Sequence, residues 1–136
     1  MTDELDEETL AFAHRVFDFA RTGDSASLMD LVREGLSPDL TNDKGDTLLI
    51  LAAYYGHSET VAALVEARAD ADRVNDRGQT ALAAAVFRKS ELSVRALLQA
   101  GADPNAGSPS ALETAAFFDL PEMTDLLQAR QARADS

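Results

Sequence analysis

Cysteine is absent from this 136-residue chain, and no uninterrupted apolar run approaches the length of a membrane-spanning helix. Without cysteine, the chain has no disulfide framework, no thiol nucleophile and no thiolate metal site. A transmembrane helix needs about 18 consecutive apolar residues, so we expect none. The first residues, MTDELDEET, are acidic where a secretory signal is basic and then apolar. Together these features predict a soluble, cytoplasmic protein.

Basic residues are also scarce, with 12 lysines and arginines against 24 acidic residues, and the formal net charge is −12. Nucleic-acid binding rests on Lys and Arg contacts to phosphates, so this charge argues against nucleic acid and against an anionic membrane surface as partners. The apolar share of 46% is nevertheless normal for a folded protein. Ten arginines against two lysines, with 25 alanines, are typical of a GC-rich bacterial coding sequence.

The usual signatures of catalysis and metal binding are missing too. No His-x-x-x-His pair, Walker loop, nucleophile elbow or glycine-rich dinucleotide turn occurs. The acidic cluster in residues 3–8 lacks the glycine turn and the carbonyl spacing of a calcium loop. The chain contains two histidines, His14 and His57, and the first has no evident partner in the sequence. We therefore expect no enzyme, no cofactor and no metal ion.

The main feature that the chain does contain is an internal repeat. Shifted by 33 residues, the stretch NDKGDTLLILAAYYGHSETVAALVEARADADRV (42–74) overlays NDRGQTALAAAVFRKSELSVRALLQAGADPNAG (75–107). A weaker copy precedes this pair in residues 17–40. Another follows in residues 110–129, where the shift falls to 30 because the preceding loop is shorter. Four units therefore account for nearly the whole chain, which is enough for a stable stack of repeats.

The period and the motifs NDKGDT, LAAYYGH and LLQAGADPN resemble the ankyrin repeat family, whose units carry D-x-x-G-x-T-P-L-H, A-A-x-x-G-H and L-L-x-x-G-A-D-x-N elements. The resemblance implies an all-α repeat solenoid of about four ankyrin repeats, each a helix-turn-helix with a β-hairpin or loop finger. The outer two repeats are expected to cap the stack. We place one domain at residues 9–136, with repeats at 9–41, 42–74, 75–107 and 108–136, after an acidic N-terminal segment at 1–8.

Individual residues agree with this architecture. Gly45 and Gly78 fall where a hairpin turn needs a positive φ, which glycine adopts without steric cost. Gly35 and Gly101 are placed to end the second helix in the left-handed conformation. Arg68 takes the place of Gly101 in the second unit, where a left-handed residue other than glycine costs about 1 kcal/mol. Hydroxyl side chains stand where they can cap the first helix of three units: Thr47, Thr80 and Ser110.

Some features depart from the family pattern. The T-P-L-H tetrad reads TLLI, TALA and SALE, so the helix-starting proline and the histidine that ties neighbouring turns are absent. The loop before the last unit, PNAGSPS, is about three residues short, so we expect a stunted last finger and an altered groove beside it. The resemblance assigns His57, in the Gly-His position, a structural role. The polar C-terminal sequence QARQARADS is expected to close the stack against water.

Aromatic residues are few, yet five of the eight fall on just two positions of the repeat. The resemblance places these positions at the end of the first helix, facing a concave groove, with the hairpin tips on the same surface. The groove candidates are Tyr54, Tyr55, Phe87, Arg88, Phe117 and Phe118. The hairpin-tip candidates are Asp43, Lys44, Asp46, Asp76, Arg77 and Gln79.

The resemblance thus implies a non-catalytic, monomeric module that binds a partner protein through its groove and hairpin tips. Aromatic anchors with a charged rim are typical of protein-binding patches, although the same rings could instead cover neighbouring helix ends. We expect Tyr55 and Phe118 to face outward more than the other three rings. Residues 1–74 carry a balance of −10 and residues 75–107 of +1, which favours a partner with a basic flank. An ordinary solvated acidic surface is the alternative.

A second hypothesis is a small-molecule or haem-handling accessory protein, because some small bacterial ankyrin proteins are linked with catalases. An aromatic groove with a nearby histidine could hold a porphyrin. The sequence weighs against this hypothesis, since neither histidine is expected to be exposed where it could ligate iron, and cysteine is absent.

Overall fold

A computed structural model describes residues 2–135 of the chain, and its side chains from residue 7 to residue 129. Within that range the secondary structure consists of eight helices and two isolated β-bridges. The helices are α1 (Thr2–Thr22), α2 (Ser25–Arg33), α3 (Leu48–Tyr54), α4 (Ser58–Glu66), α5 (Ala81–Phe87), α6 (Glu91–Gln99), α7 (Ala111–Phe117) and α8 (Pro121–Asp135).

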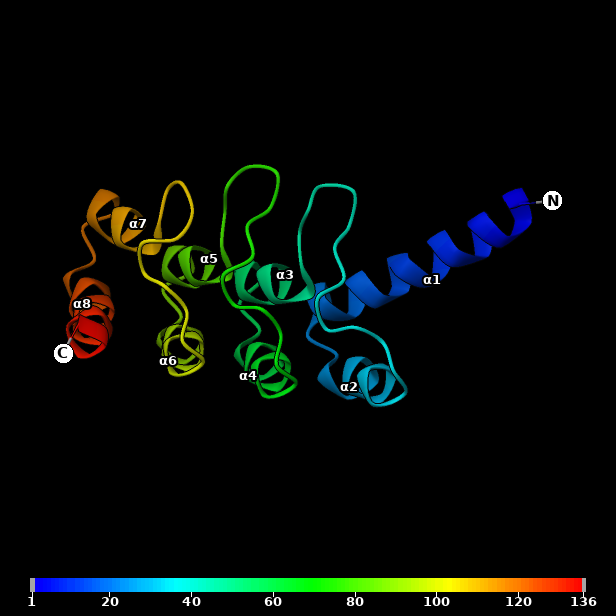
Figure 1. Cartoon of the computed structure of the whole chain (residues 1–136), viewed down its shortest axis with the longest axis horizontal. Helices are drawn as coiled ribbons and strands as arrows, with labels where there is room; N and C mark the ends of the chain where they lie inside the picture. The colour runs from blue at the N-terminus through cyan, green and yellow to red at the C-terminus, as the bar shows by residue number, and fades with distance from the viewer. Residues whose placement is uncertain (1, 136) are drawn as a thin grey trace.

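The helices form two parallel rows, with α1, α3, α5 and α7 in one row and α2, α4, α6 and α8 in the other (Figure 1). Each first helix packs on the second helix of its own unit, and α1, α3 and α5 also pack on the first helix of the next unit. The three loops that join one unit to the next fold out as fingers on the side of the first row (Figure 1). This arrangement confirms the predicted all-α repeat solenoid.

The predicted caps begin the first helix of the last three units. Thr47 Oγ1 accepts a 3.0 Å hydrogen bond from the Ile50 amide, and Thr80 Oγ1 accepts one of 3.1 Å from the Ala83 amide. Ser110 does the same for Glu113, whose carboxylate in turn accepts from the Ser110 amide at 2.9 Å. This reciprocal capping box satisfies two free amides at once.

The left-handed positions also follow the repeat. Gly45 and Gly78 have φ values of 75° and 78° in their finger turns, as predicted. Arg68 has a φ of 69°, where the equivalent Gly101 has 93°, so the expected strained residue is present. The structure adds two positions that the sequence analysis missed. Lys89 and Asp119, with φ values of 58° and 53°, follow α5 and α7 where the first two units have glycine.

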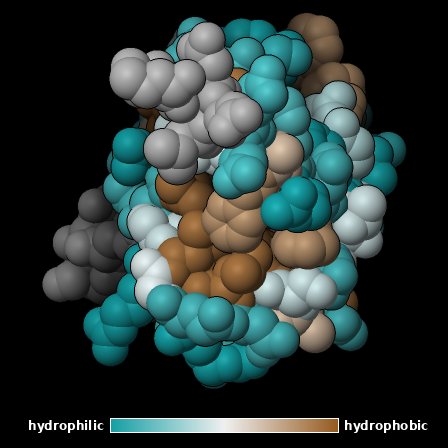
Figure 2. Space-filling view, turned by 90° about the vertical axis from the view of Figure 1, so that its right-hand side faces the viewer, coloured by the Kyte–Doolittle hydropathy of each residue, from teal (hydrophilic) through white to brown (hydrophobic). Residues whose placement is uncertain are grey.

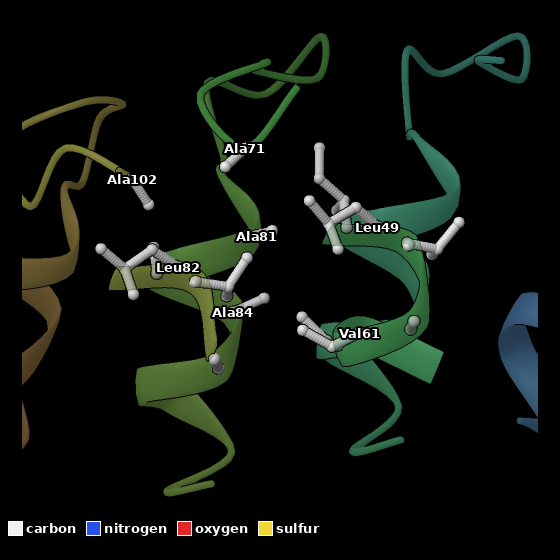
Figure 3. Close-up of a cluster of buried hydrophobic side chains, with 14 of the residues drawn as sticks. Leu49, Val61, Ala71, Ala81, Leu82, Ala84 and Ala102 are labelled. Atoms are coloured by element: carbon white, nitrogen blue, oxygen red, sulfur yellow. The ribbon is translucent and has the colours of Figure 1, made fainter. Parts of the chain in front are cut away.

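The core lies between the two rows and runs the length of the stack. All residues of α3 from 48 to 53, and of α5 from 81 to 86, are buried, because each helix is enclosed by two neighbouring units and by its own second helix. Small side chains such as Ala81 and Ala84 let these helices approach closely, while Leu49, Leu82 and Val61 fill the space between them (Figure 3). Stability therefore comes from stacking, as in other repeat folds.

The two ends of the stack differ. Helix α1 begins at Thr2, so it includes most of the predicted acidic segment, and its first half projects past α2 (Figure 1). Seen from this end, the molecule shows a patch of apolar side chains surrounded by polar ones (Figure 2). Leu10 and Phe12 on α1 are exposed. At the other end α8 runs to Asp135. The side chains of the predicted polar closure QARQARADS lie outside the described residues, except for Gln128 and Ala129.

The last finger is smaller than the two before it, as expected (Figure 1). It is nevertheless held in register with its neighbour. The Ser108 amide donates a 2.8 Å hydrogen bond to the Gly78 carbonyl, and a β-bridge between Gly107 and Ser110 closes its base. A side chain at residue 107 would lie 2.8 Å from the Gly78 carbonyl, so only glycine allows this close approach.

Candidate functional site

The first two fingers are organised by an asparagine in each turn. Asn42 Oδ1 accepts hydrogen bonds of 2.9 Å from the amides of Lys44 and Asp46. Asn75 Oδ1 accepts the equivalent bonds, also of 2.9 Å, from the amides two and four residues later. These bonds fix the backbone of each tip, so the tip side chains project from a rigid turn.

Of the six hairpin-tip candidates, four are exposed: Asp43, Lys44, Asp76 and Arg77. Gln79 is half-buried, and its Oε1 accepts a 2.9 Å hydrogen bond from the Asn75 side chain. Asp46 departs from the expectation of a contact residue. Its side chain is only 7% exposed, because it turns inward and accepts a 2.8 Å hydrogen bond from Asn75 Nδ2 of the next finger. Asp46 therefore joins two fingers and is not available to a partner.

The five aromatic groove candidates form one continuous row, which we call the aromatic ladder: Tyr54, Tyr55, Phe87, Phe117 and Phe118. The Tyr54 ring is stacked on the Phe87 ring, with 6.3 Å between centroids and 8° between planes. Phe87 meets Phe118 edge to face at 5.6 Å. Each end is closed by a second edge-to-face pair, at 5.2 Å for the two tyrosines and 5.0 Å for Phe117 with Phe118. The ladder therefore spans the last three units.

Every ring of the ladder is exposed, but not in the predicted order. Phe117 is the most exposed at 83%, whereas the other four lie between 43% and 47%. The expectation that Tyr55 and Phe118 would face outward more than Phe117 is wrong, because no further unit follows α7 and α8 in the described stack to cover Phe117. Arg88 is exposed as well. Its guanidinium lies beside Gly56, where a Cβ atom would be 3.3 Å from Arg88 Nη2.

Two adjoining hollows form the groove between the first helices and the fingers. The apolar hollow has a volume of about 320 Å³ and lies against α3, α5 and α7. Apart from the amide of Gln79 and the hydroxyls of Thr114 and Tyr54, the groups that line it are apolar: the Tyr54 ring and the side chains of Ile50, Ala83, Ala84, Phe87, Pro109 and Phe118. An uncharged concave surface of this kind suits a large apolar side chain.

The polar hollow has a volume of about 450 Å³ and lies on the N-terminal side of the apolar one, with which it shares Ile50, Tyr54 and Gln79. Lys44 and Arg77 reach it from two different fingers, and His14 and Arg21 reach it from α1. His14 and Arg21 were not among the site residues predicted from the sequence. The repeat register could have identified Arg21, since it stands at the position of Tyr54. His14 lies before the stretch 17–40 that overlays the other units, and only the fold brings it to the groove.

His57 has the structural role that the resemblance implied. Its Nε2 lies 2.6 Å from the Arg21 carbonyl oxygen at the end of α1, so the ring joins the first unit to the second. A side chain at Gly23 would lie 2.7 Å from the same imidazole. His14 differs from the expectation, because it is exposed on the wall of the polar hollow.

Two further properties concern the described residues as a set. Among them, no group of three or more His, Cys, Asp or Glu side chains is arranged to hold a metal ion. The helices of this part of the chain are all too short or too polar to cross a membrane.

Comparison with known proteins agrees with this architecture. A family model described as ankyrin repeats (3 copies) matches residues 17–108. A curated Pseudomonas aeruginosa protein, itself named only for its ankyrin repeats, is 54% identical over 65 residues, which cover 45% of this chain and 38% of that relative. The chain thus matches well under half of the length of that protein. The structure adds a fourth helix pair, α7 and α8, beyond the matched region. Since the family model covers most of the chain, the chain belongs to the ankyrin repeat family.

Proposed function

We propose that this chain is a non-catalytic binding module that holds a partner protein in its groove and at its hairpin tips. Ankyrin repeats are generally protein–protein interaction modules and typically lack catalytic activity. The observation that carries the proposal is the aromatic ladder, in which five large rings contact one another and stay exposed.

Exposure of these rings has a free-energy cost that a partner would remove. Burying a large apolar side chain contributes about 1.5–3 kcal/mol, and contiguous exposed apolar surface marks interaction sites. Neighbouring groups cover only part of each ring, since the exposed fractions range from 43% to 83%. The rings also lie next to the apolar hollow, which Tyr54, Phe87 and Phe118 line together. Aromatic anchors beside a pocket are the usual centre of a protein interface.

The exposed tip residues supply the rim of the proposed interface. They are Asp43, Lys44, Asp76 and Arg77, and Arg88 lies near the ladder. A mixed-charge rim contributes to the choice and orientation of a partner more than to affinity. The exposed acidic residues of α1, including Glu7 and Glu8, favour a partner whose flanking surface is basic. A monomeric state and a cytoplasmic location stay predictions.

The haem hypothesis has one observation in its favour. His14 is exposed in the polar hollow beside Tyr54 and Tyr55, where the sequence analysis expected no accessible histidine. Against it, charged side chains line much of that hollow, and a porphyrin face needs an apolar slot. Protein binding therefore stays the preferred function.

Affinity capture from a lysate of the source organism tests the proposal. The baits are the native chain, a triple variant (Tyr55→Ala, Phe87→Ala and Phe118→Ala), and Leu92→Ala, which removes a 70% exposed apolar side chain from the outer helix α6. Circular dichroism establishes that all three fold. We expect a protein that the native bait and Leu92→Ala retain and that the triple variant loses. Equal capture by all three baits would contradict a site on the ladder.

A further inference from the structure

The charge of the polar hollow is opposite to that of the chain as a whole. Three basic residues line it, Arg21, Lys44 and Arg77, against two acidic ones, Asp43 and Asp46, in a chain whose net charge is −12. His14 adds a further group that can donate a hydrogen bond. The lining therefore has a formal balance of +1, which makes the hollow a local cationic site in an acidic chain.

The charges in the hollow are not equally available. Asp46 is buried and its carboxylate is bonded to the Asn75 side chain, while Arg21 is paired with Asp18 at 2.7 Å. Among the residues with described side chains, neither Lys44 nor Arg77 forms an ion pair. Two exposed cations from two different fingers therefore face one hollow without an ion pair, and the exposed carboxylate of Asp43 belongs to the same lining. This arrangement leaves them free to bind an anionic group that comes from outside.

The apolar hollow adjoins this cationic site and has no charged side chain in its lining. The two hollows share Ile50, Tyr54 and Gln79, so one ligand can occupy both. A small free anion would fill only the polar hollow, and an isolated apolar group would fill only the apolar hollow. The charge of one hollow and the apolar lining of the other therefore favour a ligand that carries an anionic group and an apolar group on one flexible backbone.

We propose that the groove binds an extended segment of a partner protein, with an Asp or Glu side chain in the polar hollow and a large apolar side chain in the apolar hollow. This inference rests on the proposed function and specifies the chemistry of its partner. Neighbouring repeats are separated by roughly one helix-packing distance, about 10 Å. An extended chain rises about 3.3 Å per residue, so the two side chains should be about two to four residues apart.

The proposed acidic residue and the basic flank of the partner do not conflict. The acidic residue enters the groove, where Lys44 and Arg77 lie, and the flank lies outside it, along the exposed acidic residues of α1 such as Glu7 and Glu8. Opposite charges at two places along one partner would also fix its direction in the groove.

Selection from a random peptide library displayed on phage tests the inference, with the full chain as the immobilised target. We expect the enriched peptides to share an acidic residue about two to four positions from an aromatic or large aliphatic residue. A synthetic copy of one enriched peptide is then titrated by fluorescence anisotropy.

A charge-reversal variant, Lys44→Glu with Arg77→Glu, tests the polar hollow. Both side chains are exposed, and the hydrogen bonds to Asn42 and Asn75 at these residues come from the backbone amides, so the turns should persist. We expect the variant to bind the peptide on the order of tenfold more weakly, because attraction becomes repulsion. A peptide in which Lys replaces the acidic residue should bind the variant better than it binds the native chain. The control, Arg33→Glu with Arg95→Glu, makes the same charge change on the outer helices.

Two results would overturn the inference. One is the absence of any enriched peptide, or enrichment of peptides without an acidic residue. The other is an unchanged affinity of the Lys44→Glu, Arg77→Glu variant. A partner protein that is captured through the ladder but is indifferent to this variant would leave the proposed function standing and would reject the acidic segment. If the chain captures no partner protein through the ladder but binds acidic peptides at the groove, the proposed function is rejected and the specificity of the groove for an acidic segment is retained.

Discussion

The Asn75 side chain donates a 2.8 Å hydrogen bond to the carboxylate of Asp46, across the boundary between two fingers. Both side chains are buried, at 5% and 7% exposure. A second bond, of 3.0 Å, joins the Asp76 amide to the Lys44 carbonyl. The chain lacks the histidine with which the family ties neighbouring turns, and this Asp–Asn pair supplies a connection between the fingers.

We predict that Asn75→Ala lowers the free energy of unfolding by about 2 kcal/mol, because it leaves the buried Asp46 carboxylate without that partner and removes the bonds within its own turn. Asn42→Ala is the matched control, since Asn42 makes the same two bonds to backbone amides within its turn, and its side chain reaches Asp46 only through a long bond of 3.5 Å. Urea unfolding measures both. A loss as large in Asn42→Ala as in Asn75→Ala would show that the link between fingers contributes nothing.

We predict that Arg68→Gly raises the free energy of unfolding by about 0.5–1 kcal/mol. Arg68 holds a φ of 69°, a left-handed conformation that strains an arginine but not a glycine. Arg73→Gly removes the same exposed charge a few residues later. Of the described residues other than glycine, a positive φ occurs at Arg68, Lys89 and Asp119, so Arg73 gains nothing from glycine and should lose stability through chain entropy. Thermal unfolding of the two variants compares them, and a decrease in both would refute the strain at Arg68.

We predict that Gly23→Ala destabilises the chain more than Gly56→Ala, by on the order of 1–2 kcal/mol. The two glycines have nearly the same φ, 79° and 81°, so the backbone cost is equal. The new side chain at Gly23 would meet the His57 ring at 2.7 Å, whereas at Gly56 it would meet the flexible, exposed Arg88 at 3.3 Å. The His57 ring cannot move away without losing its bond to the Arg21 carbonyl.

A double-mutant cycle with His57→Ala isolates this contact. If the clash explains the difference, Gly23→Ala should cost much less in the His57→Ala background. The same cost in both backgrounds, measured by urea unfolding, would place the effect in the backbone of the turn and not in the His57 ring.

We predict that added haem gives no saturable shift of the Soret band, because the polar hollow is lined with charged side chains. The measurement is a spectrophotometric haem titration of the purified chain, with His14→Ala as the comparison. A stoichiometric band that the native chain shows and His14→Ala lacks would favour the haem hypothesis. A band that persists in the variant would indicate binding elsewhere, without His14 as a ligand.

The sequence by itself determined the repeat architecture and its local details. The caps Thr47, Thr80 and Ser110 depend on residues within one turn of helix, so their motifs predict them correctly. The left-handed positions of Gly45 and Arg68 were predicted for the same reason. The two positions per unit that carry the aromatic ladder followed from the register, because every unit places equivalent residues at equivalent points.

The sequence could not determine which of these side chains contact one another across units, or which of them are buried by a neighbouring unit. Phe117 occupies the position of Tyr54 and Phe87, yet it is far more exposed, since exposure depends on whether another unit follows. Asp46 looks like a tip residue in sequence, but the Asn75 amide of the next finger draws it inward. Neither exposure nor this pairing is encoded within one unit.

The polar hollow depends on the tertiary structure most of all. Its cations come from α1 and from two fingers, and His14 lies before the stretch 17–40 that overlays the other units. Each of these residues is an ordinary exposed residue in its own segment. They form one cationic hollow only because stacking brings three segments, distant in sequence, against the same groove, and stacking is driven by the apolar faces that each unit cannot bury alone.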